Sequence, residues 1–563
     1  MTDSHSSFRC PNCRSRLPTF TPVPPSPVPH LLGTNKIPSN AEAINIRASI
    51  ASKSLQRDRA RLDDDIARTR RVLERLYSER DALTAYTNEH AAFLTIARRV
   101  PVEIWSEIFW HCMPGTMTIK DSQMTRHYNE PSELMSFNPR KAPALFLRVC
   151  RDWRTTAIST PRLWSLIDLN ASSTFLSVTP TLVQTWLKRS QQAPLSMLLS
   201  NSPYIPLTFF QNPLVRTTLE QSHRWQTIYM HQWQASMGVF LPLKNNLPDL
   251  EELHVRFYAE RDPLHQRASD IFLNAPKLHR VTIYGSPPYP IVDMQLPWPQ
   301  LTHLSLREEK SIIALRAVLQ SAPNLLALDW LLSQPYRMES GSESLTMVQH
   351  PRLLDFSVFL YSDPGSSFNC LALPALRKLS IKTSRRFEAS PWKIFESFLS
   401  RNGQAVESFQ LAADLADASK LTACLKILPA LTDLTLAISG RVTDSAELKH
   451  LLKSLSYTGT DPFILSALQR ITIICQRTAS DCNILTMFID MIESRWRLSH
   501  LYDRSVKARS KSQHKASHAR IRRASFVIQL ASRGTTTDLG DEDCRVPKLR
   551  AEGLAVQVSS ISA

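Results

Sequence analysis

The chain has 563 residues, of which 43% are hydrophobic and 21% charged, and its formal net charge is +17 at pH 7. It is long enough for two or more domains or for one extended array of repeats. We predict no transmembrane helix, because no apolar run reaches the roughly eighteen residues that a span needs. We also predict no signal peptide, because the first residues lack its charged and apolar pattern. Cysteines lie singly in apolar stretches, as at Cys112, Cys150, Cys424 and Cys475. This is typical of a reduced protein inside the cell, in the cytoplasm, the nucleus or both.

Motifs that carry catalysis are absent from the sequence. The twelve glycines form neither GxxxxGK nor GxGxxG, the spacings that bind phosphate groups. Neither HExxH nor GxSxG occurs. We therefore predict that the chain is not an enzyme and holds no cofactor.

Residues 1–40 are predicted to form a disordered, proline-rich arm, since the run from Pro18 to Pro29 favours an extended polyproline conformation. Cys10 and Cys13 make a lone CxxC motif. A structural zinc site needs four ligands and no second pair lies nearby, so two ordinary thiols are favoured over a metal site.

Residues 41–97 contain no glycine or proline and predict a long helix. Apolar residues keep the 4-3 spacing of a heptad seam, with Thr69 and Arg80 as its polar members. The apolar members are Leu62, Ile66, Leu73, Leu76 and Leu83. Such a seam favours a coiled coil with a second helix. A single helix that packs back on the next domain fits equally well.

Residues 98–169 hold two short amphipathic segments. The first begins at Pro101, a residue suited to the first turn of a helix, and places Ile104 and Ile108 at helical spacing. The second is LRVCRDWR (147–154), followed by STPRLW (159–164). Thr160 should end this helix, because a residue before proline is disfavoured in the helical conformation.

These segments, VPVEIWSEIF and LRVCRDWRTTAISTPRLW, resemble the F-box, in particular the F-box-like module that is abundant in mushroom-forming (basidiomycete-type) fungi. The resemblance implies a small all-α domain, here with a long exposed loop inserted at 115–142. Val100 and Trp105 depart from the leucine and the small aliphatic residue that are usual in the family. The resemblance also implies an interface with a Skp-type adaptor, formed by Pro101, Ile104, Ile108, Phe109, Val149, Cys150, Trp153 and Leu163.

A phrase of the type L-x-x-L-x-L recurs further along the chain, at intervals near the leucine-rich-repeat period. Its nine copies begin at Leu250, Leu278, Leu301, Leu325, Leu353, Leu376, Val406, Leu431 and Leu468. Helical patterns lie between them, so each unit predicts a strand, a turn and a helix, and stacked units form a parallel sheet over a shared core. We assign 241–533 to an irregular α/β leucine-rich-repeat solenoid. Residues 170–240 are assigned to an entry region, either a cap or a divergent first repeat, in which 194–199 and 225–230 are predicted strands.

Variable positions of the phrase should lie on the concave face and contact a target. Examples are His254, Arg256, Thr282, Ser305 and Thr435. Residues 495–523 hold ten Lys or Arg and a single acid. We interpret them as a solvated basic loop, with a nuclear-import signal or a site for an anionic partner as alternatives. Residues 523–530 alternate like a last strand, and 534–563 are predicted to be a disordered tail.

An F-box followed by leucine-rich repeats resembles the substrate receptor of a Skp–cullin–F-box ubiquitin ligase. The resemblance implies a non-enzymatic bridge, which binds the Skp adaptor, and through it a cullin, by the F-box and holds a target protein on the repeats. One alternative is a leucine-rich-repeat interaction scaffold that recruits no ligase. Another is a protein that binds nucleic acid through 495–523, although that stretch lacks the interleaved aromatic residues that stack on bases.

Overall fold

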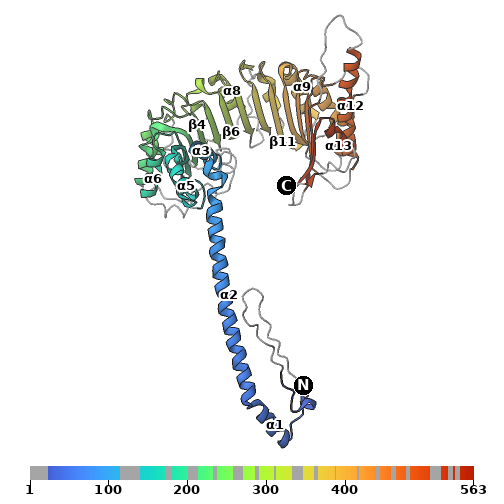
Figure 1. Cartoon of the computed structure of the whole chain (residues 1–563). Coiled ribbons are helices and arrows are strands. Elements are labelled where there is room, and N and C mark those ends of the chain that lie inside the picture. Colours follow the sequence, from blue (N-terminus) through green and yellow to red (C-terminus); the bar gives the residue numbers. More distant parts are fainter. Residues whose placement is uncertain are drawn as a thin grey trace. The chain divides into compact units, whose positions relative to one another are not determined.

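A computed structural model gives the fold of the chain (Figure 1). It describes residues 23–113, 140–170, 180–200, 213–231, 237–257, 270–285, 291–309, 312–332, 347–360, 365–386, 389–414, 417–438, 444–457, 464–476, 482–506, 521–530, 537–538 and 545–562. The chain divides into two compact units, residues 1–102 and 103–563. Within the described ranges no helix is both long and apolar enough to cross a membrane.

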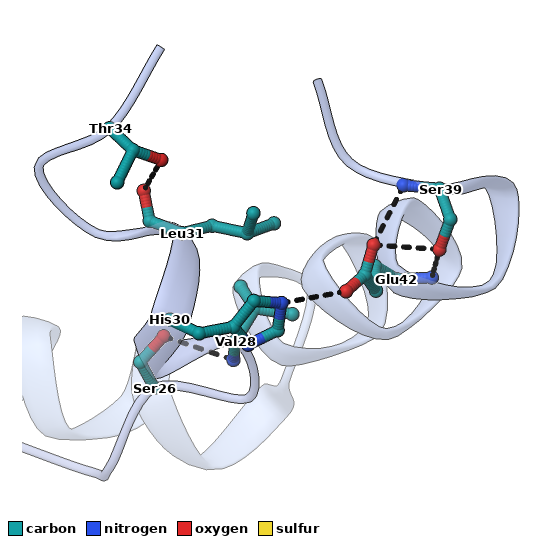
Figure 2. Close-up of polar contacts among 7 residues, drawn as sticks. All are labelled: Ser26, Val28, His30, Leu31, Thr34, Ser39 and Glu42. Atoms are coloured by element: carbon teal, nitrogen blue, oxygen red, sulfur yellow. Dashed lines mark hydrogen bonds and ion pairs between the residues drawn. The ribbon is translucent and has the colours of Figure 1, made fainter. Parts of the chain in front are cut away.

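The first unit begins with a short ordered segment that leads into helix α1 (Asn40–Ile50). Ser39 and Glu42 form a capping box, in which the Glu42 carboxylate accepts a 2.7 Å hydrogen bond from the Ser39 backbone N–H (Figure 2). The hydrogen bonds from Ser39 hold the pKa of Glu42 below its ordinary value. The ring of His30, in the 3-10 helix η1 (Pro29–Leu31), lies 2.9 Å from the same carboxylate (Figure 2).

The prediction of disorder is therefore wrong for residues 23–40. Val28 is buried at 6% exposure, and the His30 contact joins the segment to the start of α1, so packing and a hydrogen bond fix it. Residues 1–22, with Cys10 and Cys13, lie outside the described residues.

Helix α2 (Lys53–Phe93) follows α1 after a break at residues 51–52, and a 3-10 helix, η2 (Ile96–Arg99), comes next. The predicted long helix is thus confirmed, as two helices in place of one. The seam leucines and Ile66 are between 37% and 68% exposed. These exposures show that nothing else in the described part of the first unit covers the seam. Both the coiled coil and packing on the next domain stay predictions.

The two predicted amphipathic segments are helical. They form α3 (Val102–His111), η3 (Ala144–Arg148), α5 (Arg151–Ser159) and η4 (Pro161–Trp164). Cys150 caps α5, since its thiol accepts a 3.5 Å hydrogen bond from the backbone N–H of Trp153. Thr160 is extended and ends α5 before Pro161, as predicted. Most of the predicted insertion loop, at 114–139, lies outside the described residues.

The rest of the second unit is built on one sheet of fifteen described strands, with neighbouring strands parallel except at its last pair, β16 and β17. In spatial order the strands are β1 (Leu166–Asn170), β2 (Leu195–Ser200), β3 (Trp225–His231), β4 (Glu252–Arg256), β5 (Arg280–Tyr284), β6 (His303–Glu309), β7 (Ala327–Leu332), β9 (Asp355–Leu360), β11 (Lys378–Arg386), β12 (Ser408–Asp414), β13 (Asp433–Ile438), β14 (Arg470–Gln476), β15 (Arg523–Leu530), β17 (Ala555–Ser562) and β16 (Thr537–Asp538). Strands β8 (Val348–Gln349) and β10 (Leu371–Ala372) form a separate pair.

Helices connect the strands and cover one face of the sheet (Figure 1). They are α6 (Pro180–Ser190), α7 (Pro213–Leu219), α8 (Ile312–Ser321), α9 (Ala389–Asn402), α10 (Ala418–Lys426), α11 (Asp444–Leu455), α12 (Cys482–Val506) and α13 (Arg545–Ala551). Shorter connections are 3-10 helices: η7 (Ser222–Arg224), η8 (Met237–Leu243), η10 (Ile291–Asp293), η11 (Trp298–Gln300), η12 (Gly365–Cys370) and η13 (Gly403–Ala405). The parallel sheet with helices on one side is the predicted α/β leucine-rich-repeat-like fold.

All nine predicted phrases supply strands to this sheet. In each, the two later apolar residues point into one continuous core, as Leu434 and Leu436 do in β13. The first residue of the phrase, Leu431 in this repeat, is buried in the same core. A single unit could not bury these side chains, and stacking the units removes them from water.

Three predicted boundaries are wrong. The sheet starts at β1 and not near residue 241. The two strands predicted in the entry region, β2 and β3, belong to it, and their core residues, such as Met197, Trp225 and Met230, do not follow the L-x-x-L-x-L phrase. The tail after residue 534 is not disordered throughout, since β17 pairs with β15 along its whole length. The predicted basic loop begins inside α12, and its described ends are a helix and a strand. Residues 507–520 lie outside the described residues.

Three buried polar side chains link successive repeats through backbone carbonyls. Arg224 donates to the carbonyl of Ala193 at 2.9 Å, and Asn402 donates to that of Leu371 at 3.4 Å. Arg495 is only 4% exposed. Its guanidinium donates to the carbonyl oxygens of residues 455, 464 and 465 at 2.6, 2.7 and 3.2 Å. Burial lowers the pKa of Arg495 to about 10, so it stays charged at neutral pH.

Arg495→Met should destabilise the C-terminal repeats by about 2–4 kcal/mol, because three buried carbonyl oxygens lose their donors. Hydrogen exchange of the β14 and α11 amides measures this loss. Arg497→Met is the matched control, since Arg497 lies in the same helix but is exposed and pairs with Glu493. Equal exchange in the two variants would contradict the role given to Arg495.

Candidate functional site

The helical module of α3, η3, α5 and η4 has its own aromatic core. Phe109 and Phe146 stack with ring centroids 4.3 Å apart. Trp153 packs edge-on to Phe109 at 4.9 Å and lies 5.0 Å from Trp105. Leu163 and Trp164 complete the core and have no exposed surface.

This core continues into the first repeat. Trp164 packs edge-on against Trp186 of α6 at 4.7 Å, and its indole N–H donates to the carbonyl of Ala157 at 2.7 Å. The guanidinium of Arg189, also in α6, lies over the Trp164 ring at 4.4 Å. Burial, and to a lesser degree the charge of Arg154, lowers the pKa of Arg189. Helix α6 contributes Trp186 to this core and Val183 and Leu187 to the core of the repeats, so the module packs directly on the first repeat.

Part of the predicted adaptor-binding set is exposed on the helices of this module. Ile104, Ile108 and Val149 are 50%, 39% and 53% exposed, and Pro101 and Cys150 are also exposed. Leu145 and Ile158, which the prediction missed, are 42% and 38% exposed. We define Ile104, Ile108, Leu145, Val149 and Ile158 as the apolar patch. The sequence signal for the two missed members was present, as apolar residues in helical segments beside predicted ones.

Two of the predicted adaptor residues are buried in the module. Phe109 is 1% exposed and Leu163 is fully buried, so in this structure both side chains hold the module together. Their contact with an adaptor stays a prediction. Trp153 is half-buried between Trp105 and Phe109 and takes part in both the core and its surface.

Trp153→Ala should therefore act first on folding. Removing a large side chain from this core should destabilise α3 and α5 by about 3 kcal/mol, measured as faster hydrogen exchange of their amides. Ile104→Ala should leave the exchange of both helices nearly unchanged. If Trp153→Ala exchanged at the wild-type rate, Trp153 would be a surface residue only.

The face of the sheet opposite the helices carries the second candidate surface. The strand register aligns one residue from each repeat in a single row, which we call the polar row. From β5 to β15 it reads Thr282, Ser305, Asp329, Ser357, Ser380, Gln410, Thr435, Thr472 and Ser525. Three of the predicted target-contacting residues belong to this row, and its members are half-buried.

A second row lies two residues further along each strand and is mostly apolar. Its members from β7 to β15 are Leu331, Phe359, Lys382, Ala412, Ala437, Ile474 and Val527. All but Lys382 are half-buried. A polypeptide could bury apolar side chains on this row and hydrogen-bond to the hydroxyl and amide groups beside it.

The same face is filled at its N-terminal end. Tyr229 and His254 stack with ring centroids 4.4 Å apart, and Leu198 and Tyr284 join Tyr229 in a small buried cluster. His254 is only 3% exposed, so its predicted contact with a target is wrong. Arg256, the other predicted residue here, lies half-buried over the Tyr284 ring at 5.5 Å. Burial raises the pKa of Tyr229, which keeps the phenol neutral.

Asp355 lies at the start of β9, two residues before Ser357 of the polar row. Burial raises its pKa from the ordinary 3.8, an effect that the nearby charge of Lys378 only partly offsets. The fold therefore favours the protonated carboxyl. Its contribution to stability is present below the ordinary pKa and is lost as the pH rises through the raised pKa.

Asp355→Asn should raise the free energy of unfolding of this region at pH 7 and change it little at about pH 3, below the ordinary pKa. Hydrogen exchange of β7, β9 and β11 at the two pH values measures the difference. An equal effect at both pH values would contradict the burial of a charged carboxylate.

Among the residues that the structure describes, no group of three or more His, Cys, Asp or Glu side chains is placed to hold a metal ion.

Comparison with known proteins gives no family. No protein-family profile matches the chain, and no curated protein sequence matches it. Solved structures similar to part of the chain include the TLR13–ssRNA13 complex (13% identity, 60% of this chain, 42% of that chain, TM-score 0.29). A Bacteroides fragilis protein matches at 14% identity over 55% of this chain and 65% of its own, with a TM-score of 0.25. The Legionella pneumophila leucine-rich repeat-containing protein LegL7 matches at 13% identity over 55% of this chain and 74% of its own, with a TM-score of 0.23. At these scores the likenesses carry no argument about function.

Proposed function

We propose that this chain is the substrate receptor of a Skp–cullin–F-box type ubiquitin ligase. The helical module binds the Skp-type adaptor, and the repeats hold a target protein. The chain contributes no catalytic group. It raises the local concentration of the target near the ubiquitin-conjugating enzyme, which accelerates transfer without new chemistry.

The apolar patch is the observation that carries this proposal. The module has enough aromatic residues to fill its own core, yet it leaves Ile104 and Val149 about half exposed. Exposed aliphatic side chains on folded helices are suited to a protein partner. Their position in segments that resemble the F-box makes the Skp adaptor that partner.

The polar row and the apolar row beside it support a protein target. Hydroxyl and amide side chains such as Ser380, Gln410 and Thr435 suit hydrogen bonds to a polypeptide, and Phe359 offers a half-buried aromatic anchor. Aromatic anchors contribute a large part of the binding free energy at protein interfaces.

The test is binding of the purified full chain to the Skp-type adaptor of its own source organism, measured by calorimetry. Ile104→Asp combined with Val149→Asp should weaken the adaptor complex at least about tenfold, or 1.4 kcal/mol, because two charges would be desolvated at the contact. Leu273→Asp is the matched control, since Leu273 is 42% exposed but lies in the repeats. It should bind like the wild type.

Loss of binding in the control as well would mean that the charges act nonspecifically. No binding by the wild-type chain would contradict the receptor function. The chain would then be a leucine-rich-repeat scaffold that recruits no ligase, and the concave face would remain its interaction surface.

A further inference from the structure

Helix α2 presents a continuous apolar stripe to solvent. Leu62, Ile66, Leu73, Leu76 and Leu83 are all exposed by more than a third of their surface. Val72, Tyr77 and Tyr86, which flank the stripe, are 54%, 49% and 61% exposed. A helix of 41 residues derives little stability from propensity alone and gains most of it by burying such a stripe.

The heptad positions limit how a second copy could cover the stripe. With Ile66 and Leu73 at position a, Arg59 and Arg80 are also at a, and Leu62, Thr69, Leu76 and Leu83 are at d. In a parallel pair each a residue faces its own copy. Arg59 and Arg80 would then meet their copies inside the seam, and Asp58 at g would face Asp63 at e.

The charge on α2 is divided between its halves. Residues 53–72 hold seven Lys or Arg and four Asp or Glu, whereas residues 73–93 hold two Lys or Arg and four Asp or Glu. The first half is therefore net positive and the second net negative. Two copies that run in opposite directions place the net positive half of each helix beside the net negative half of the other, and two parallel copies place halves of like net charge together.

One antiparallel register satisfies the apolar layers as well. When Leu73 faces Leu76 of the second copy, Ile66 faces Leu83 and Leu62 faces Thr87. Arg80 then faces Thr69, and Arg59 faces His90, so neither arginine meets its own copy. In this register residue 56 lies opposite residue 93, so the two helices overlap over nearly their full length.

We propose that the chain forms a homodimer through an antiparallel coiled coil of two α2 helices, centred between Leu73 and Leu76. The dimer carries two adaptor-binding modules and two concave faces. The inference rests on α2 alone and is independent of the proposed function.

The first experiment is the mass of the full chain in solution by light scattering across a concentration series. The wild type should have twice the chain mass at and above about 10 μM, a concentration at which a specific interface persists. Leu73→Asp combined with Leu76→Asp should halve the mass at the same concentration. Ser78→Asp combined with Ala82→Asp, two exposed positions of α2 outside the seam, should leave it unchanged.

A wild-type chain that stays monomeric would overturn the proposal. The stripe would then be a surface for another segment, such as the chain's own residues 1–22 or a helix of another protein. A dimer unaffected by the seam substitutions would also overturn it, because the contact would then lie elsewhere.

Disulfide trapping tests the direction. In the antiparallel register two copies of residue 62 lie about 37 Å apart, since 25 residues at about 1.5 Å separate residue 62 from residue 87, and no disulfide spans that distance. Leu62→Cys combined with Thr87→Cys should give a covalent dimer on oxidation, identified by a peptide joining the two sites. Leu62→Cys alone should give no more than the wild type, whose exposed Cys112 and Cys150 set the background. Efficient trapping by Leu62→Cys alone would overturn the antiparallel arrangement.

Discussion

In the stack of repeats each strand buries its apolar residues only against its neighbours. The first and last repeats would therefore expose their cores to water, and both ends of the stack need a cover. This constraint shapes the rest of the second unit. At the N-terminal end the helical module supplies the cover, through the contact of Trp164 with Trp186. At the other end α13 and β17 close the core with residues such as Val546 and Val558. The sheet then ends in β16, which runs antiparallel to β17 and stops the pattern of parallel addition.

Buried polar side chains, as well as leucines, fix the position of each irregular repeat relative to the next. Arg224, Asn402 and Arg495 are buried, and each donates to the backbone of the unit before it. The acceptors lie where a regular element ends or turns, as at Leu455, the last residue of α11, and Ala193, in the turn after α6, and a long side chain can reach them. The repeats can therefore differ in length without leaving buried carbonyl groups unsatisfied.

The regular parts of the fold were predictable from the sequence, and the parts that depend on distant contacts were not. The strands of the nine phrases were predicted correctly, because Leu, Ile and Val at a fixed spacing mark the positions that a strand buries. Strands β2 and β3 were predicted but not assigned to the array, because Trp225 and Met230 fill core positions without matching the leucine pattern. The last strand, β17, was missed, since its polar Ser559 and Ser560 occur in a strand that only pairing with β15 and β16 explains.

The predicted adaptor-binding residues show, one by one, that distant contacts cannot be predicted from the sequence. Spacing placed Ile104, Phe109 and Leu163 on helices, but helical spacing alone does not say which apolar side faces the module's own core. Burial separates them, since Phe109 and Leu163 hold the core and Ile104 faces solvent. His254 failed for a related reason, because the ring of Tyr229 in the adjacent strand covers it.

Side chains fill the N-terminal end of the concave face, and this fixes a minimum distance between the helical module and anything bound on that face. Tyr229, His254 and Tyr284 close the first strands, so the accessible part of the face begins near β6. Five strand spacings of about 4.8 Å separate β6 from β1, which adjoins the helical module, or about 24 Å along the sheet. Because the module packs directly on the first repeat through α6, this separation behaves as a rigid spacer. Anything bound on the accessible strands is held at a fixed distance from whatever binds the module, and one repeat added or removed between β1 and β6 would change that distance by a single strand width.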